Sequence, residues 1–381
     1  MIGLLLSLPA HGGEWSGNVS AELRSFMQTA QAPMQHDNTL SIATELEYYH
    51  EWDDGRQSIT FTPFFRIDQH DSRRTNADLR ELMWVQAGDN WELQIGVGKV
   101  FWGVTEAVHL VDIINQTDLV ENPDGEQKLG QPMIKISLER EWGTVDMFAM
   151  PGFRARTFPG KDGRLRSHPQ VNPDGDRYES AAKKHHTDLA LRWSHSIEDW
   201  DVGLSHFWGT SRDPRMLVTG AVFTPYYEII HQTSLDLQAT KGDWLWKLEA
   251  LRRSGQGKSY YAVTGGFEYT EVGVFGASDL GLLLEYMVDD RRESAPTPFQ
   301  DDLFFAFRWT ANDSQSTEIL AGMILDRDSG ARMFNVEASR RLGSDWKLSV
   351  QGRGWGHVPG ADPLHGMHLD DYLEVNLARY F

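Results

Sequence analysis

The sequence predicts an all-β chain that forms a single closed antiparallel β-barrel across a membrane, with about 18 strands or alternatively about 16. Three observations predict this fold. Apolar and polar residues alternate with a period of two along most of the chain, the alternating segments are long, and short connections alternate with long ones. Tilted strands of about 9–11 residues cross a bilayer, and tight turns at one rim with long loops at the other connect them.

The alternation places the strands in chain order. Ile134, Ile136 and Leu138, for example, alternate with charged and hydroxyl side chains, as expected for a strand with one apolar and one polar face. The predicted strands are 17–29, 38–51, 57–68, 78–87, 91–101, 132–142, 143–150, 185–195, 199–208, 226–239, 243–253, 259–271, 278–289, 300–310, 316–327, 331–341, 345–355 and 369–381.

Tryptophans lie at the ends of these segments, beside the short turns, as interfacial aromatic girdles require. These residues are Trp52, Trp91, Trp142, Trp200, Trp244 and Trp346. An array of soluble β-sandwiches is the structural alternative, because a strand that packs one face on a core and exposes the other to water alternates in the same way.

Composition excludes several classes of protein. The chain has 381 residues, no Cys and a formal net charge of -19. The acidic balance argues against nucleic-acid binding, which needs a basic surface, and the missing thiols exclude disulfides and Cys-ligated metals. No apolar run approaches the ~18–20 residues of a membrane-spanning helix.

The first residues look like the end of a secretory signal peptide. An apolar run over 2–8 is followed by Pro9 and the small residues around Gly12. We therefore assign 1–13 to a signal-peptide remnant and 14–381 to the barrel. The absence of Cys fits an exported protein, because a spare thiol mispairs in an oxidising compartment.

The last residues carry a resemblance to a known class. Leu373, Val375 and Leu377 alternate with polar or small residues, and the chain ends on Phe381. This segment resembles the final strand of Gram-negative outer-membrane β-barrels, which commonly ends in an aromatic residue. The resemblance implies an outer-membrane location, recognition of the strand by the barrel-assembly machinery, and contacts with outer-membrane lipid and lipopolysaccharide.

Residues 103–131 are the least strand-like part of the chain. Trp102-Gly103 and Asn122-Pro123 frame the segment, which is similar to an uncharacterised porin-like family and to the third loop of general porins. That resemblance implies a loop folded into the lumen as a constriction. An external solvated loop is the alternative. The candidate constriction residues are Glu106, Asp112, Asn115, Asp118 and Glu121.

Charges on the polar faces of the strands should line water, because Arg or Lys at mid-bilayer costs roughly 2–4 kcal/mol on the lipid face. Both signs occur, which favours a hydrated lumen, although neighbouring strands could equally pair these charges with one another. The candidate lumen-wall residues are Arg66, Lys135, Arg192, Arg308, Arg341, Arg353, Glu139 and Glu337.

Motifs for catalysis and metal binding are weak. The stretch 254–259 resembles the end of a phosphate-binding loop but lies in a predicted hairpin, with Arg252 where glycine is required. Ser205 with His206 is the remaining catalytic candidate, and Asp174 with Asp176 supplies too few oxygens for calcium. We expect no enzyme, no cofactor and no metal site. The basic connection 151–184 favours a solvated loop or contact with lipopolysaccharide phosphates.

The predicted function is a porin-type channel for passive diffusion of small hydrophilic solutes, without a nucleic-acid partner. The alternatives are a substrate-specific uptake or polysaccharide-export barrel, and a plugged, non-conducting adhesive or structural barrel. The sequence leaves the solute and the oligomeric state open.

Overall fold

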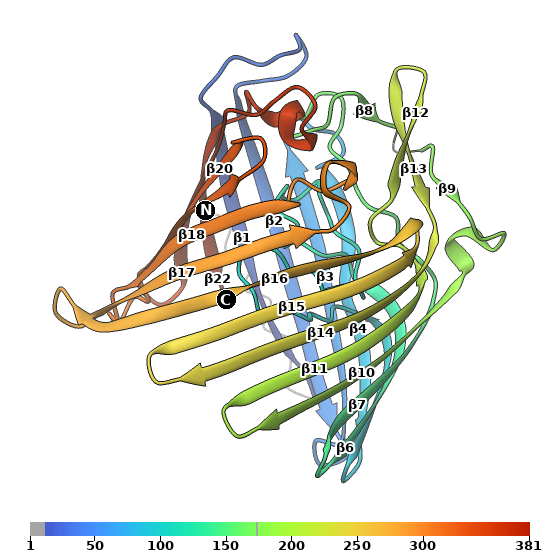
Figure 1. Ribbon diagram of the computed structural model, residues 1–381. Coiled ribbons are helices and arrows are strands. Elements are labelled where there is room, and N and C mark those ends of the chain that lie inside the picture. The colour runs from blue at the N-terminus through green and yellow to red at the C-terminus, as the bar shows by residue number, and fades with distance from the viewer. Residues whose placement is uncertain (1–11, 173) are drawn as a thin grey trace.

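The computed structural model describes residues 12–172 and 174–381 and contains one closed β-barrel (Figure 1). Its 18 strands are β1 (Glu14–Phe26), β2 (Asn38–Trp52), β3 (Gln57–Asp68), β4 (Asn76–Ala87), β5 (Trp91–Gly98), β6 (Gln131–Arg140), β7 (Gly143–Pro151), β10 (Thr187–Ile197), β11 (Trp200–Thr210), β14 (Ile229–Lys241), β15 (Trp244–Gly255), β16 (Gly257–Val274), β17 (Ser278–Asp289), β18 (Asp301–Thr310), β19 (Glu318–Asp326), β20 (Arg332–Leu342), β21 (Trp346–Gly356) and β22 (Tyr372–Tyr380).

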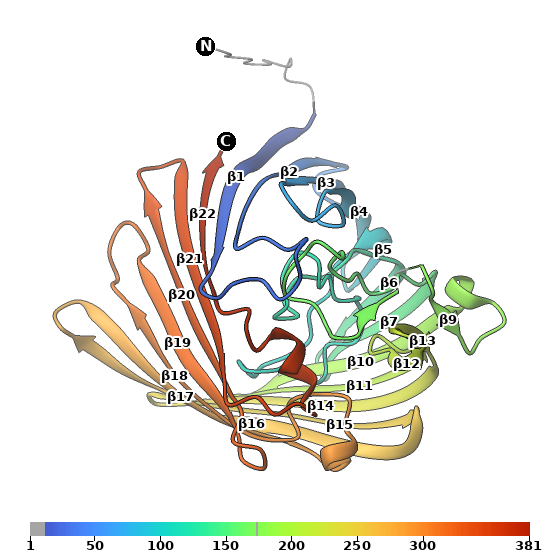
Figure 2. The ribbon, with the colours of Figure 1, turned by 90° about the horizontal axis from the view of Figure 1, so that it is seen from above.

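Pairing between the first and last strands closes the barrel. Asn18 is opposite Tyr380 and Phe26 is opposite Tyr372 in the antiparallel register of β1 and β22. Viewed from above, these two strands lie side by side in the ring (Figure 2). Every neighbouring pair in the barrel is antiparallel, so the prediction of a closed antiparallel barrel is confirmed, with 18 strands rather than 16.

The two faces of the sheet are inverted relative to those of a soluble protein. On β1, Trp15 and Leu23 are 49% and 47% exposed, whereas Glu22 and Arg24 on the opposite face are 3% and 6% exposed. Apolar side chains thus cover the outside of the barrel and polar ones line its inside. This inversion excludes the sandwich alternative, in which the apolar faces of two sheets pack together.

Short and long connections lie on opposite rims. Two-residue turns such as 198–199 and 242–243 join strands at one rim, while segments such as 99–130 and 152–186 join them at the other. The six predicted girdle tryptophans lie at the short-turn rim and are all exposed. The predicted rhythm of turns and loops is therefore confirmed.

The outer β15–β16 connection is an exception to the long-loop rule. Gly255 and Gly257 have φ angles of +107° and +83° and form a tight hairpin around Gln256. Only glycine adopts such angles without strain. The stretch 254–259 is therefore a hairpin and not a phosphate-binding loop between a strand and a helix.

Two outer connections contain structure that the sequence did not predict. Parts of the connections 152–186 and 211–228 form a small second sheet of β8 (Gln170–Val171), β9 (Arg177–Tyr178), β12 (Arg215–Thr219) and β13 (Val222–Tyr227). Val171 and Tyr227 are buried in it, at 6% and 0% exposure. A few apolar residues spread over two loops give no local period, so alternation did not reveal this sheet.

Three short 3₁₀ helices complete the outer loops: η1 (Lys183–His185), η2 (Arg292–Ser294) and η3 (Pro363–Met367). Within the described residues, no helix has the length and apolarity required to cross a membrane. The assigned signal-peptide remnant 1–13 lies almost wholly outside the described residues.

Candidate functional site

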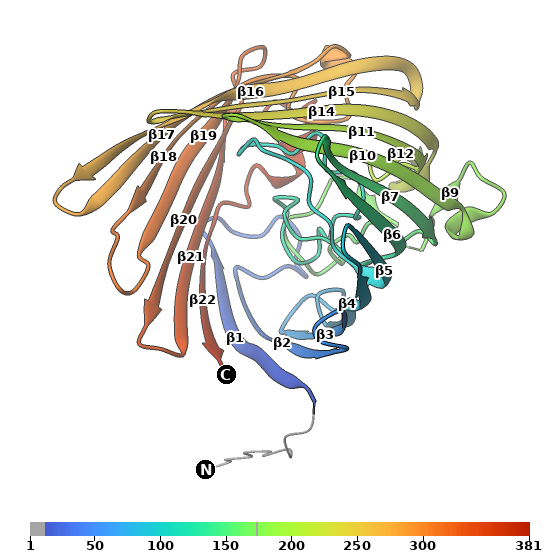
Figure 3. The same cartoon turned by 90° about the horizontal axis from the view of Figure 1, so that it is seen from below.

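The connection between β5 and β6, residues 99–130, lies inside the ring of strands (Figure 3). It forms only isolated bridges, at Thr117 with Lys128 and at Asp118 with Thr157. Its side chains and backbone contact inward-facing residues on several sides of the barrel. We call residues 99–130 the lumen loop.

An apolar cluster attaches the lumen loop to one wall. Trp102, Val111, Ile113 and Ile114 are 0–4% exposed, and they pack on inward-facing apolar residues of six strands. Those wall residues are Met83, Met133, Phe148, Met150, Ala190, Phe207 and Ile230. Burial of each large side chain contributes about 1.5–3 kcal/mol, so this cluster holds the loop firmly against the wall from β4 to β14.

Two buried carboxylates, on β15 and β17, also hold the lumen loop. One oxygen of Glu249 on β15 accepts hydrogen bonds from the Val104 and Thr105 N–H groups at 2.7 and 3.1 Å, and the other accepts from the Val111 N–H at 3.1 Å. Glu285 on β17 accepts from the N–H groups of residues 106 and 107 at 2.8 and 2.9 Å. Unpaired loop amides thus find acceptors on the wall.

Asn115 closes the base of the lumen loop. Its side-chain oxygen accepts from the Val100 N–H at 2.8 Å, and its amide nitrogen donates to the carbonyls of Gly98 and Leu129 at 2.9 and 2.8 Å. All of these partners belong to the ends of the same connection. Asn115, a predicted constriction residue, thus also holds the two ends of the lumen loop together.

All four predicted constriction acids form ion pairs, and Glu106 contacts Arg308 of β18 at 2.7 Å. Glu121 contacts Arg66 at 2.9 Å. Asp118 contacts Arg80 at 2.9 Å, and Asp112 contacts Lys128 at 3.1 Å within the loop itself. Glu121 and Asp118 are 7% and 4% exposed. Their charges face basic residues of the wall more than the open lumen.

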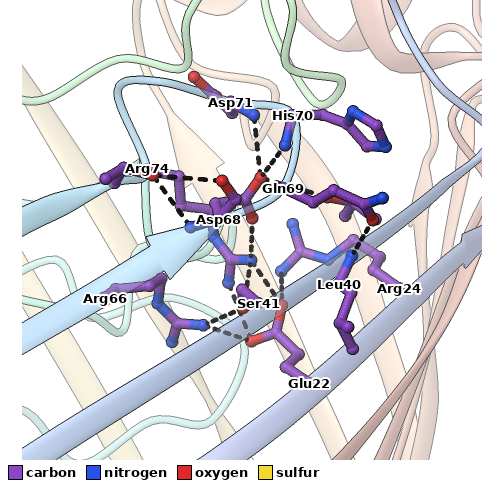
Figure 4. A network of polar contacts seen from close by, with 12 residues as sticks. Glu22, Arg24, Leu40, Ser41, Arg66, Asp68, Gln69, His70, Asp71 and Arg74 are labelled. Carbon is purple, nitrogen blue, oxygen red and sulfur yellow. Dashed lines mark hydrogen bonds and ion pairs between the residues drawn. The ribbon is translucent and has the colours of Figure 1, made fainter.

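A polar network joins inward-facing residues of β1, β2 and β3 to Arg74 of the β3–β4 connection (Figure 4). Arg74 contacts Glu22 at 2.6 Å and Asp68 at 3.1 Å, while Arg66 contacts Glu22 and the Ser41 hydroxyl at 3.0 and 2.6 Å. Because Arg66 also binds Glu121, this network links the wall to the tip of the lumen loop.

The predicted lumen-wall residues all lie on the inward face, and five of them form ion pairs of 3.5 Å or less, Arg66 with Glu22 and Glu121 as described above. Arg192 binds Asp236 through two hydrogen bonds of 2.7 Å. Arg308 contacts Glu106 at 2.7 Å. Arg353 contacts Asp124 at 2.9 Å and Glu337 at 3.5 Å.

The remaining wall residues lie near the short-turn rim. Lys135 contacts Asp146 at 3.6 Å. Glu139 and Arg341 are exposed, and neither side chain forms an ion pair with another described residue. The structure does not bring these three to the lumen loop.

Sequence reasoning missed the residues that position the lumen loop. Besides Glu249 and Glu285, Arg212 from an outer loop donates to the Ile114 carbonyl at 2.9 Å and contacts Asp188 of β10 at 2.6 Å. Alternation placed Glu249 on the polar face of its strand. No local signal distinguishes a lumen carboxylate that binds backbone from one that faces water.

A cavity of about 1750 Å³ lies between the lumen loop and the inner faces of β15–β21. Glu106, Asp112 and Asn115 are among its lining residues, whereas Asp118 and Glu121 are not. Asp124 and Glu126, which lie in the predicted loop but outside the candidate set, also line it. The cavity extends outward past Arg253 and the outer connections.

Burial and neighbouring charges set the ionisation of the lumen loop. Burial raises the pKa of Asp112 and of Asp124 above their usual values, despite Lys128 and Arg353. Burial lowers the pKa of His109, but the hydrogen bond and charge of Glu126 outweigh it, so that this pKa lies above its usual value. His109 Nε2 lies 3.3 Å from a Glu126 oxygen.

The residues considered for catalysis and for calcium binding do not come together in a site. Ser205 is 4% exposed on the inner face of β11, whereas His206 is exposed on the outer face. Asp174 contacts Arg73 at 3.3 Å. Within 12–172 and 174–381, no group of three or more His, Asp and Glu side chains is placed to hold a metal ion.

Comparisons with known proteins identify the fold. No family model and no curated protein sequence matches the chain. Two crystal structures of Pseudomonas aeruginosa OpdO, one titled OccK3 (OpdO), align with 97% of this chain and 96% or 95% of theirs, at TM-scores of 0.56 and 0.55 and 10% identity. The chain therefore has the same β-barrel fold as OpdO. A mutant of Rh. blastica porin aligns with 97% of this chain and 100% of its own at a TM-score of 0.48 and 11% identity.

Proposed function

We propose that this protein is an outer-membrane channel through which small hydrophilic solutes diffuse passively, and that the lumen loop is its constriction. The observation that carries the proposal is the cavity of about 1750 Å³ inside a barrel with an apolar outer face and a charged inner face. A polar lumen of this kind holds water, and its charges act on solutes that enter it.

The constriction lies where the lumen loop approaches β18–β21. Glu106 contacts Arg308 of β18 there, and Asp124 contacts Arg353 of β21. Glu126 and Glu337 add further negative charge to the cavity lining. We therefore propose that the constriction favours cations, with Glu106 and Asp112 contributing as predicted and Asp124 and Glu126 added to the set.

The test is single-channel conductance of the purified, refolded protein in planar lipid bilayers. We expect steady current steps that increase with salt concentration, together with migration on a cold denaturing gel that shifts after boiling. Folded protein that gives no current steps contradicts the channel.

A plugged barrel that binds a partner through its outer loops is the second candidate. It is favoured by the many attachments of the lumen loop, which reach β3, β4, β15, β17, β18 and β21. The same conductance measurement separates the two functions. Export of an acidic polymer is less supported, because Arg192, Arg308 and Arg353 all pair with carboxylates.

The proposed outer-membrane channel would also contact the barrel-assembly machinery, lipid and lipopolysaccharide. The alternating strand β22, followed by Phe381, is the segment through which the assembly machinery would recognise the chain. Outer-membrane lipid would contact the exposed apolar face, with lipopolysaccharide at the rim that carries the long loops.

A further inference from the structure

One stretch of the lumen wall is apolar although it faces the cavity. Five inward-facing residues of three adjacent strands form it, and we call them the lumenal strip: Phe304, Leu320, Gly322, Ile324 and Met333. Phe304 is paired with Ile324, and Ile324 with Met333, so the side chains are contiguous across β18, β19 and β20. The lipid-facing residues of β18, such as Phe305 at 43% exposure, lie on the other side of the sheet.

The lumenal strip differs from the apolar cluster on the opposite wall. There the lumen loop covers the apolar side chains, and Val111 and Ile114 are fully buried. Over the lumenal strip, the apolar residues that pack from the loops are Ala107, Val108 and Phe299. Phe304 and Ile324 are each 7% exposed, and Leu320, Gly322 and Met333 are half-buried. All five strip residues remain part of the cavity lining. An apolar surface beside water attracts the apolar part of a solute.

Charge in the same cavity is divided along its length. Towards the outer loops, the described lining residues include seven basic and four acidic side chains, with Arg156, Arg253 and Arg291 among the basic ones. Around the lumen loop, five acidic side chains face Lys128, Arg353 and the His109 imidazole. The outer part is therefore net positive and the constriction net negative. A solute with one charge is attracted by one part and repelled by the other.

We propose that the cavity selects zwitterionic solutes that carry an apolar group, such as apolar amino acids and short apolar peptides. The apolar group contacts the lumenal strip, the ammonium group is directed to the acids of the lumen loop, and the carboxylate to the outer arginines. The inference rests on the proposed channel function and names its substrate class.

Liposome swelling with solutes of matched size tests the proposal. Leucine and asparagine are zwitterions of nearly equal size that differ in apolarity, while leucinamide and 4-methylpentanoate keep the leucine body with one charge each. We expect leucine to enter roughly threefold to tenfold faster than asparagine and faster than both singly charged analogues. Empty liposomes supply the background rate.

Variants locate the effect. L320N and I324N place amides on the lumenal strip and should reduce the leucine-to-asparagine ratio to near one. The control is L245N, because Leu245 faces the lumen on β15 but does not line the cavity. If either strip variant does not fold, the comparison of the four solutes in wild-type protein still tests the proposal.

The outcomes are distinguishable. Equal rates for leucine and asparagine in wild-type protein, a ratio unchanged in both strip variants, or a singly charged analogue that matches leucine would overturn the substrate class while leaving the channel intact. Folded protein without salt conductance would overturn the channel function and the inference together.

Discussion

At the scale of single residues, inward-facing carboxylates perform two different tasks in this barrel. Glu22 and Glu337 pair with arginines, as charges on neighbouring strands commonly do. Glu249 and Glu285 instead accept backbone N–H groups of the lumen loop and are essentially buried, at 0% and 1% exposure. These hydrogen bonds act together with the apolar cluster and the ion pairs to position the lumen loop.

Substitution E249Q should loosen the lumen loop, because the amide replaces one of the two charged oxygens that accept its backbone N–H groups. We expect a loss of roughly 1–3 kcal/mol in the free energy of unfolding and larger fluctuations of the open-channel current. Urea unfolding followed by gel mobility, together with bilayer recordings, measures both effects.

The matched control is E337Q, because the Glu337 side chain is 44% exposed and binds side chains rather than the lumen loop backbone. Current noise and stability equal to wild type in E249Q would contradict the positioning role.

At the scale of elements, the lumen loop is a charged segment whose ionisation is sensitive to pH. Burial lowers the pKa of His109, but the hydrogen bond and charge of Glu126 outweigh it and hold this pKa above its usual value, which favours the protonated imidazolium. Burial raises the pKa of Glu126, but the hydrogen bond and charge of His109 outweigh it and lower this pKa. Asp112 and Glu249 are the other acids that face His109.

The cation-to-anion permeability ratio should therefore rise with pH. His109 loses its positive charge as the pH passes upward through its raised pKa, which makes the lumen loop more negative. We expect roughly a twofold increase in the ratio between about pH 6 and pH 9, obtained from reversal potentials in a salt gradient. The pairing of His109 with Glu126 contributes stability that is complete at lower pH and disappears over the same rise.

Variant H109Q serves as the comparison, since glutamine is neutral throughout this range. Its permeability ratio should be flat over the same interval. A wild-type ratio independent of pH, or one that changes equally in H109Q, would argue against this titration.

At the scale of the whole molecule, the stability of the fold depends on which side of the sheet meets lipid. Closure between β1 and β22 leaves no unpaired edge. Arg24 of β1 reaches Glu374 of β22 across that seam at 2.6 Å. A sheet closed in this way satisfies its backbone hydrogen bonds in a medium without water.

Arginine introduced on the outer face of β20 should reduce stability, whereas arginine on its inner face should reduce conductance. V336R places the charge on the outer face, where Val336 is 44% exposed. This variant should destabilise the barrel folded in lipid by about 2–4 kcal/mol. N335R adds a charge to the lumen next to Arg353 and should leave folding nearly unchanged while reducing cation conductance. Folding titrations in lipid vesicles compare the variants, and equal destabilisation would refute the assigned orientation.

The sequence by itself determined the strands, their two faces and the rims to which the connections belong. Period-two alternation is local, and each side chain partitions between lipid and water according to its own chemistry. Predicted segments such as 38–51, 57–68 and 278–289 therefore agree with β2, β3 and β17 to within one residue.

Only the tertiary structure decided how the lumen loop is held and which acids line the cavity. The partners are far apart in sequence: Arg353 and Asp124 are separated by 229 residues, and Thr105 and Glu249 by 144. No local pattern encodes such pairs, because barrel closure and register bring them together. Asp118 and Glu121 consequently lie in ion pairs with the wall, while the lumenal strip borders the cavity.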